Sequence, residues 1–185
     1  QEAGIERALL IGGGNSELAG EFSCVMDILK TGLLAKYGIN ALDFAGHPEG
    51  NPDDPNSEFH LLEKLRWTEE RGIPARIITQ WCLDTDGANA WISGLREKGI
   101  CNPIHIGIPG PSTIKTLMRF AKVCGVKAST KILRKQGLNL SKLMFVNKPD
   151  KIISGLRGYD QLHLYPFGGL EKSAAWLTEW QRNNL

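Results

Sequence analysis

Short runs of apolar residues alternate along the chain with longer segments in which apolar residues recur every three or four positions. Apolar runs of about four to eight residues bounded by glycine or proline are typical of buried strands, whereas the wider spacing is typical of one face of a helix. The pattern predicts strands at 5–15, 39–46, 75–83, 103–110 and 161–169. It predicts helices at 22–38, 56–72, 87–99, 112–125 and 170–184, and a further helical region from Ser129 to about Arg157, interrupted near Pro149.

This alternation indicates repeated βαβ units and therefore the parallel sheet of an α/β protein. Two architectures agree with it, an open doubly wound sheet and a closed (β/α)8 barrel of the TIM type. In both of them, ligands bind at the carboxyl ends of the strands. The length of 185 residues suits one domain with a sizeable core, so we expect a single domain, 1–185.

The charges are nearly balanced, with 22 Lys and Arg against 20 Asp and Glu and a net charge of +2. This balance gives no electrostatic reason to expect nucleic acid or an anionic membrane as a partner. No apolar run approaches the ~20 residues that span a bilayer. The four cysteines show no C-x-x-C spacing, so we expect reduced thiols, no metal site and a cytoplasmic protein.

The stretch "FAGHPEGNPD" marks the end of the second predicted strand, because an apolar run stops there and polar residues and prolines follow. Since side chains alternate between the faces of a strand, His47 shares a face with Asp43, and Gln80 shares one with Arg76. Asp43 and Arg76 would pair, because an unpaired buried charge is costly. His47 and Gln80 lie nearer the strand ends and are candidates for contacting a ligand. Alternatively, His47 caps a turn and Gln80 satisfies backbone groups.

Glycines follow the first strand, at Gly12, Gly13 and Gly14. Such a run allows the backbone to approach a ligand closely or to adopt positive φ. It does not form G-x-G-x-x-G, and no lysine follows to complete a phosphate loop; a tight turn explains it equally well. In "PGPST", Ser112 or Thr113 is a candidate N-cap for the helix that follows.

Four strand-end motifs resemble those of the methylenetetrahydrofolate reductase family. They are, in this order, "HPEGNPD", "IITQWCLD", "GIPGPST" and "LHLYPF", and the resemblance runs from about Gly4 to Ser173. It implies a (β/α)8 barrel of which this chain supplies roughly strands 4 to 8. It also implies FAD lying across the strand ends, with a tetrahydrofolate derivative stacked on it. The activity would be hydride transfer that interconverts 5,10-methylene- and 5-methyltetrahydrofolate, with NAD(P)H as electron donor.

The resemblance also assigns roles to individual residues. Substrate binding falls to Gln80, His47 and Glu49, and cofactor binding to Gly12, Gly13, Gly14, His47, Asn51 and His60. The family's acidic catalytic residue lies on the first strand, outside this chain, so a longer chain or a partner would supply the remainder of the barrel.

Several of these positions depart from the family pattern. The family's Arg-Gly-Asp is Gly12 to Gly14 here, its aromatic residue is His47, its histidine is Asn51, and its flavin-contacting aspartate falls near His60 or Leu61. The loss of that aspartate removes a charge that would tune the electronics of the flavin. Gln80 and Glu49 are kept, so the folate side is better preserved than the flavin side.

Three hypotheses follow. The first is the folate-dependent oxidoreductase described above, existing alone or as a homo-oligomer. The second is a flavin-free relative that binds folate or transfers one-carbon groups. The third is a non-catalytic subunit that completes the barrel of a partner chain.

Overall fold

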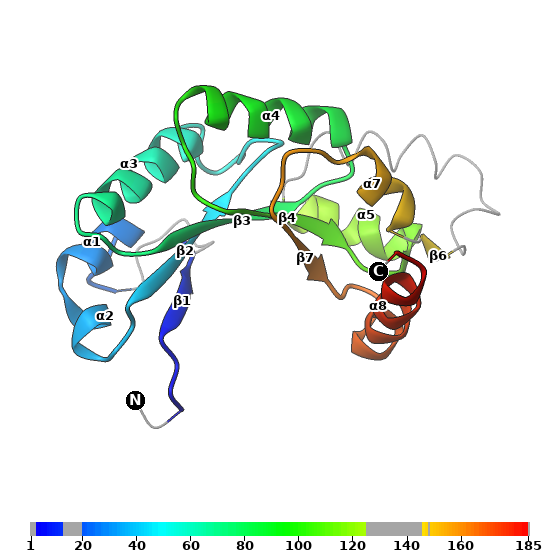
Figure 1. Cartoon of the computed structure of the whole chain (residues 1–185), viewed down its shortest axis with the longest axis horizontal. Coiled ribbons are helices and arrows are strands. Elements are labelled where there is room, and N and C mark those ends of the chain that lie inside the picture. The colour runs from blue at the N-terminus through cyan, green and yellow to red at the C-terminus, as the bar shows by residue number, and fades with distance from the viewer. Residues whose placement is uncertain (1–2, 13–19, 125–145, 148, 185) are drawn as a thin grey trace.

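The computed structural model describes residues 3–12, 20–124, 146, 147 and 149–184, and its centre is a parallel sheet (Figure 1). The five strands pair in chain order, β1-β2-β3-β4-β7. Each predicted strand is found, although the first and the last are shorter than expected. The strands are β1 (Arg7–Leu10), β2 (Ala41–Gly46), β3 (Ala75–Trp81), β4 (Ile104–Pro109) and β7 (Gln161–Tyr165).

The strand order distinguishes between the two architectures. A doubly wound sheet reverses direction at a switch point, whereas a barrel adds each new strand to the same growing edge. Here every new strand joins the edge left by the strand before it. Because βαβ crossovers are right-handed, this winding places the connecting helices on one face of the sheet. The α/β fold is confirmed, and the order of its five strands is consistent with part of a barrel; the (β/α)8 barrel itself remains a prediction.

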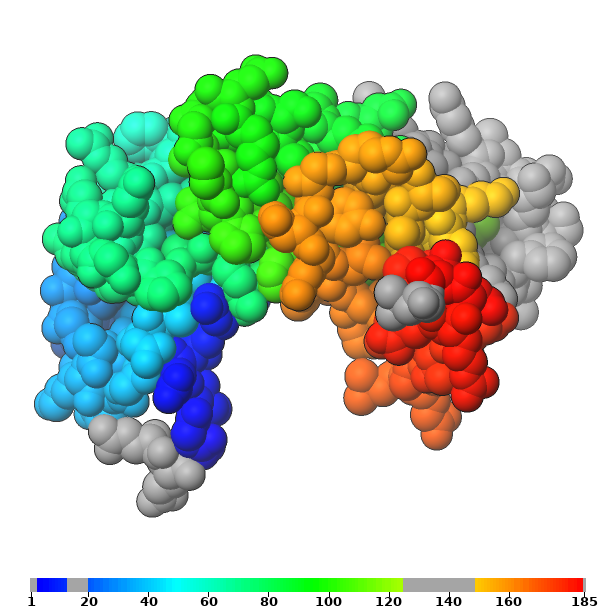
Figure 2. Space-filling model, in the orientation of Figure 1, coloured from blue at the N-terminus to red at the C-terminus, as the bar shows by residue number. Residues whose placement is uncertain are grey.

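The sheet is strongly curved, and helices α3, α4 and α7 cover its convex side (Figure 1). The space-filling view shows the molecule hollowed between β1 on one side and β7 with α8 on the other (Figure 2). The described helices are α1 (Val25–Lys30), α2 (Leu33–Lys36), α3 (Ser57–Glu69), α4 (Thr85–Glu97), α5 (Ile114–Val123), α7 (Asp150–Gly155) and α8 (Leu170–Asn184). Two short strands, β5 (Ser112–Thr113) and β6 (Val146–Asn147), pair antiparallel. None of the described helices has the length and apolar character needed to cross a membrane.

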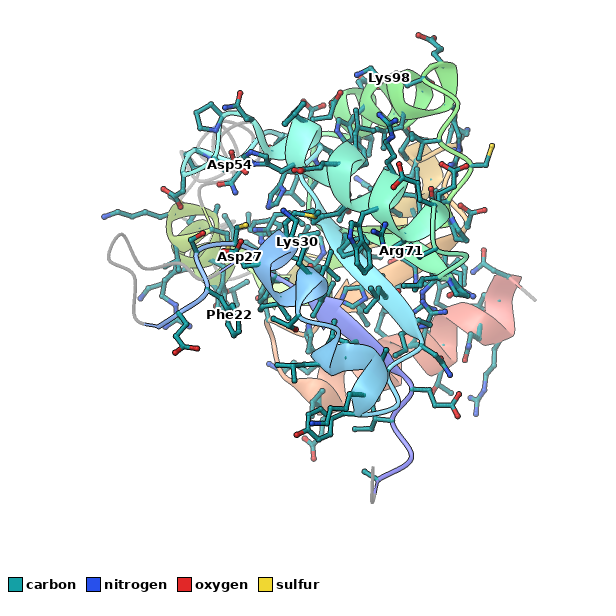
Figure 3. All side chains as sticks on the ribbon, turned by 90° about the vertical axis from the view of Figure 1, so that its left-hand side faces the viewer. Phe22, Asp27, Lys30, Asp54, Arg71 and Lys98 are labelled. Carbon is teal, nitrogen blue, oxygen red and sulfur yellow. The ribbon has the colours of Figure 1, made fainter. Side chains whose placement is uncertain are left out.

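The single helix predicted at 22–38 is wrong, because Thr31 and Gly32 divide it into α1 and α2. Gly32 has φ +71°, which favours glycine and cannot continue a right-handed helix. The Thr31 hydroxyl donates to the Ile28 carbonyl (2.7 Å) and accepts from the Leu33 N–H (3.1 Å). Phe22 therefore lies before the helix, at the surface, with 44% of its area exposed (Figure 3).

Side-chain caps mark the starts of α4 and α5. The Asp84 carboxylate accepts the Gly87 N–H (3.1 Å) and so starts α4 two residues earlier than predicted. Thr113 caps α5 as expected, by accepting the Thr116 N–H (3.2 Å). At α3 the residue in the cap position is Asn56, but its side chain makes no capping hydrogen bond. Of the helical region predicted from Ser129 to Arg157, residues 129–145 and 148 lie outside the described part of the chain.

The helix-covered face of the sheet carries the main core. Its strand residues are fully buried, and they pack against α3 and α4. A second, smaller cluster forms at the carboxyl ends of β3 and β7, where Trp81 packs edge-on against Phe167 (centroids 5.3 Å apart) beneath α5. The central residues of the main core are Phe44, Ile77, Ile104, Ile106, Ile108, Leu61, Leu65, Ile92 and Leu95.

The opposite side of the sheet, here termed the inner face, is polar. The strand register Leu9↔Asp43↔Arg76 places Asp43 and Arg76 side by side, and their predicted ion pair is confirmed. Arg76 binds the Asp43 carboxylate through two nitrogens (2.8 and 2.6 Å), and Arg7 of β1 binds it as well (2.8 Å). Burial alone would raise the pKa of Asp43, but the hydrogen bonds from Arg76 and Arg7 outweigh burial and lower it.

Asp43→Asn tests this network. The substitution keeps the side-chain shape but leaves two guanidinium groups without a counter-charge, and we expect it to lower the free energy of unfolding by about 1–3 kcal/mol. Urea denaturation of the purified protein measures the change. As a matched control, Glu70→Gln removes an exposed ion pair with Arg66 on α3 and should change stability by less than about 0.5 kcal/mol. Equal effects of the two variants would contradict a structural role for the inner-face network.

Candidate functional site

The carboxyl ends of β2 and β3 form the candidate site. Gly46 pairs with Thr79, so the residues that follow them, His47 and Gln80, lie at the ends of neighbouring strands. Sequence reasoning made both side chains candidates for contacting a ligand at these strand ends. The structure brings the two strand ends together, but the surroundings of the two side chains differ.

His47 lines a pocket of about 270 Å³ between the β2–α3 loop, the start of α3 and the middle of α4. Neither Gln80 nor Glu49 is among the residues that line it. Glu58, which does line it, also contacts Lys98 at the end of α4 (Lys98 is labelled in Figure 3). The pocket residues are His47, Pro48, Gly50, Pro55, Ser57, Glu58, Leu61 and Trp91.

The His47 imidazole is half-buried, and its pKa is lowered from 6.5. Burial is the main cause, the positive charge of Lys64 adds to it, and the negative charge of Asp54 opposes both. His47 is therefore a neutral imidazole at neutral pH, able both to donate and to accept a hydrogen bond. Lys64 is itself half-buried, with its ammonium 5.7 Å from the centre of the Phe44 ring, and burial lowers its pKa.

Two polar side chains predicted to contact a cofactor, Asn51 and His60, form hydrogen bonds within the loop after His47. The Asn51 side-chain oxygen accepts the Asp53 N–H (3.0 Å), and His60 Nδ1 lies 2.8 Å from an Asp54 carboxylate oxygen. Asp54 lies where the loop meets α3 (Figure 3), and its other oxygen accepts the Asn56 N–H (3.0 Å). Asn51 and Asp54 therefore hold the loop in shape, and the exposed His60 ring is tethered to it.

Gln80 lies in an irregularity of β3. Between the pairs Ile78↔His105 and Trp81↔Gly107, β3 advances three residues while β4 advances two, which is a β-bulge. The alternation used to place Gln80 on the face of Arg76 therefore does not extend past Ile78. The half-buried Gln80 side-chain oxygen accepts the N–H of the next residue (3.3 Å), and its amide nitrogen makes no hydrogen bond to any described residue.

Glu49 approaches the same end of β3. The thiol of Cys82 is fully buried, and burial together with the negative charges of Glu49 and Asp84 raises its pKa to about 12. The β2 loop thus brings a carboxylate close to the residues that follow Gln80. All four cysteines carry free thiols in the structure.

Of the glycines after β1, Gly12 is described, and no atom lies within 4 Å of the position that a Cβ would occupy there. Gly13 and Gly14 lie outside the described residues. Sequence reasoning missed Lys64, Asp54 and Trp91. The helical spacing of Lys64 from His60 (i, i+4) was the available signal for Lys64, whereas nothing in the sequence pointed to Trp91 as a pocket wall.

Comparison with known proteins decides the family. No protein-family model matches the chain. It is 29% identical over 180 residues to the probable methylenetetrahydrofolate reductase (NADH) of Oryza sativa subsp. japonica, a match that covers 85% of this chain and 29% of that protein. It is 30% identical over 176 residues to methylenetetrahydrofolate reductase 2 of Saccharomyces cerevisiae (86% and 28%) and 31% identical over 149 residues to methylenetetrahydrofolate reductase 1 of Schizosaccharomyces pombe (73% and 23%).

The chain belongs to the methylenetetrahydrofolate reductase family. The resemblance inferred from the strand-end motifs is thereby confirmed. The chain spans less than a third of the length of these family members, with 29%, 28% and 23% of each covered.

Gly46→Ala tests how closely α4 packs over the end of β2. A Cβ at Gly46 would lie 2.7 Å from Trp91 Cη2 and 2.8 Å from Ile77 Cγ2, so we expect Trp91 to be displaced from the pocket and stability to fall by about 1–3 kcal/mol. Urea denaturation measures the loss. The control is Gly94→Ala in α4, because a Cβ at Gly94 would have no neighbouring atom within 4 Å. The better helix propensity of alanine should stabilise the protein by up to about 1 kcal/mol. A Gly46→Ala protein as stable as the parent would show that the contact is loose.

Stability should also depend on pH through three histidines. The pKa values of His47, His105 and His163 are all lowered from 6.5, mainly by burial. Below pH 6.5 the unfolded chain therefore binds more protons than the folded one, so the free energy of unfolding should fall as the pH is lowered from 7 to 5. Urea denaturation at each pH provides the test, and His163→Gln should flatten the slope. Asp43 titrates below this window. A rise in stability on acidification would contradict the assignment.

Proposed function

We propose that this chain carries part of the folate site of a methylenetetrahydrofolate reductase-type oxidoreductase. The reaction is hydride transfer that interconverts 5,10-methylene- and 5-methyltetrahydrofolate through FAD, with NAD(P)H as electron donor. The observation that carries the proposal is the position of Gln80, at the carboxyl end of a barrel-type strand beside His47. The name of the rice relative includes NADH, which favours NADH as the donor.

Each residue at this edge has a role in the proposed site. The Gln80 amide N–H groups donate to the pterin ring of the folate, since they make no hydrogen bond to the described residues. The neutral His47 imidazole packs against the substrate or the cofactor. Asn51 shapes the rim by holding its loop, and Glu49 places a carboxylate at the end of β3.

The donors near His47 suit the charge of FAD. Its diphosphate is anionic, and the half-buried Lys64 ammonium lies near enough to His47 to lower the pKa of that residue. Lys64, His47 and the Gly12 to Gly14 backbone would hold the cofactor, and His60 would lie at its margin. When bound, the flavin supplies the ring that carries the hydride. The pocket at His47, about 270 Å³, can hold only part of so large a cofactor.

A second candidate is a flavin-free relative that keeps the folate site. It is favoured by the residue at about the position of the family's flavin-contacting aspartate. In this chain that residue is His60, and its ring is paired with Asp54. A purified protein that is colourless yet binds tetrahydrofolate would support this candidate over the first.

A third candidate is a non-catalytic subunit that completes a partner's barrel. Among the described residues, β1 and β7 each pair along one edge only, and β1 and its flank expose Leu9 (44%) and Ile11 (66%). Co-purification of a chain that supplies parallel strands would support it, whereas a monomer that unfolds cooperatively alone would count against it.

Ligand titration of the full-length protein tests the leading proposal. Flavin fluorescence should be quenched at micromolar FAD, and Gln80→Ala should weaken tetrahydrofolate binding about tenfold while leaving FAD binding unchanged. Gln161→Ala is the matched control, because Gln161 is an exposed glutamine at the opposite end of the sheet. Absence of FAD binding removes the reductase mechanism, and equal tetrahydrofolate binding by parent and Gln80→Ala removes the role of Gln80.

A further inference from the structure

The bulge in β3 is stabilised by three residues that sequence reasoning did not assign to any site. They are Thr79 in the bulge, Gly107 on β4 and Tyr165 on β7, and they are termed the bulge brace here. A bulge leaves ladder groups unpaired, and each unpaired buried backbone group is costly. The bonds that satisfy these groups therefore decide whether the bulge persists.

Thr79 bridges the two strands where the regular ladder is interrupted. Its hydroxyl accepts the Gly107 N–H (2.7 Å) and donates to the carbonyl of Gln80 (2.9 Å). The Thr79 side chain is fully buried, so water cannot substitute for these bonds. The hydroxyl thus ties the backbone of Gln80 to β4.

Tyr165 reaches across β4 to the same point. Its hydroxyl donates to the Thr79 carbonyl (2.9 Å), although β7 and β3 are not neighbours in the sheet. The ring fits because Gly107 lies beneath it: a Cβ there would be 2.5 Å from the Thr79 carbonyl oxygen and 2.8 Å from Tyr165 Cε2. Burial, and next the charge of Cys124, raise the pKa of Tyr165 to about 12, so this donor keeps its proton throughout the neutral range.

We infer that Thr79 and Tyr165 are positioning residues that hold the β3 bulge and thereby direct the Gln80 amide toward the ligand at the strand ends. The inference rests on the proposed function for the identity of that ligand, a tetrahydrofolate derivative. The geometry itself needs no ligand, because the bonds of the bulge brace are made within the described chain. Tyr165 and Thr79 act through Gln80.

Crystal structures and hydrogen exchange of variants of the full-length protein test the geometry without any ligand. Thr79→Val and Tyr165→Phe should displace the Gln80 amide by about 1 Å or more. Thr79→Val should also speed exchange of the Gly107 N–H about tenfold or more, because its acceptor is gone. Thr79→Ser keeps the hydroxyl and should match the parent. Tyr37→Phe, which alters an exposed tyrosine, should have no effect. An unmoved Gln80 in both Thr79→Val and Tyr165→Phe would overturn the inference.

A double-mutant cycle with tetrahydrofolate as the probe tests the link to binding. Tyr165→Phe should weaken binding about five- to tenfold in the parent and have no further effect in a Gln80→Ala background. A penalty of equal size in both backgrounds would overturn the inference, since a purely structural effect persists without Gln80. If the parent protein fails to bind tetrahydrofolate, the proposed function fails, and the position of Gln80 in the variant structures then decides the inference alone.

Discussion

The site depends on parallel pairing that proceeds in one direction around the sheet. Each strand joins the edge left by its predecessor, so all strands finish at one rim and all connecting helices cover one face. The candidate site residues are consequently close together in space although they are far apart in the sequence. The contact of Tyr165 with Thr79, 86 positions apart in the chain, exists only because of this winding.

The features that could be predicted from the sequence are those that depend on a regular repeat of residues along a strand or a helix. Strands and helices follow from apolar periodicity, and the Asp43–Arg76 pair follows from alternation along two regular strands. Where the backbone is irregular, the sequence argument failed. Thr31 and Gly32 break a helix whose apolar spacing runs through them without interruption, and the bulge at Thr79 and Gln80 shifts the alternation by one residue. The sequence around Thr79 does not show that its hydroxyl replaces a ladder hydrogen bond, because the group that needs an acceptor is the Gly107 N–H on β4.

Strand alternation and the family resemblance both pointed to His47 and Gln80 as candidate site residues, but neither described what surrounds them. The hollow beside His47 is walled by Trp91 of α4 and by the start of α3, and those contacts are tertiary. Lys64 and Asp54 show the same limitation. Both influence the charge state of His47, yet neither belongs to a strand-end motif. A helix residue becomes part of such a site through the angle at which its helix packs, and apolar spacing does not specify that angle.

The sharing of Asp43 between Arg7 and Arg76 has an electrostatic consequence for the inner face. Two guanidinium groups against one carboxylate leave a surplus of one positive charge, and about a third of the Arg7 side chain remains exposed beside it. A segment approaching that face gains if it carries an acidic side chain at the depth of Arg7 and is repelled if it carries a lysine. The network thus favours acidic over basic side chains in a segment that packs against the inner face.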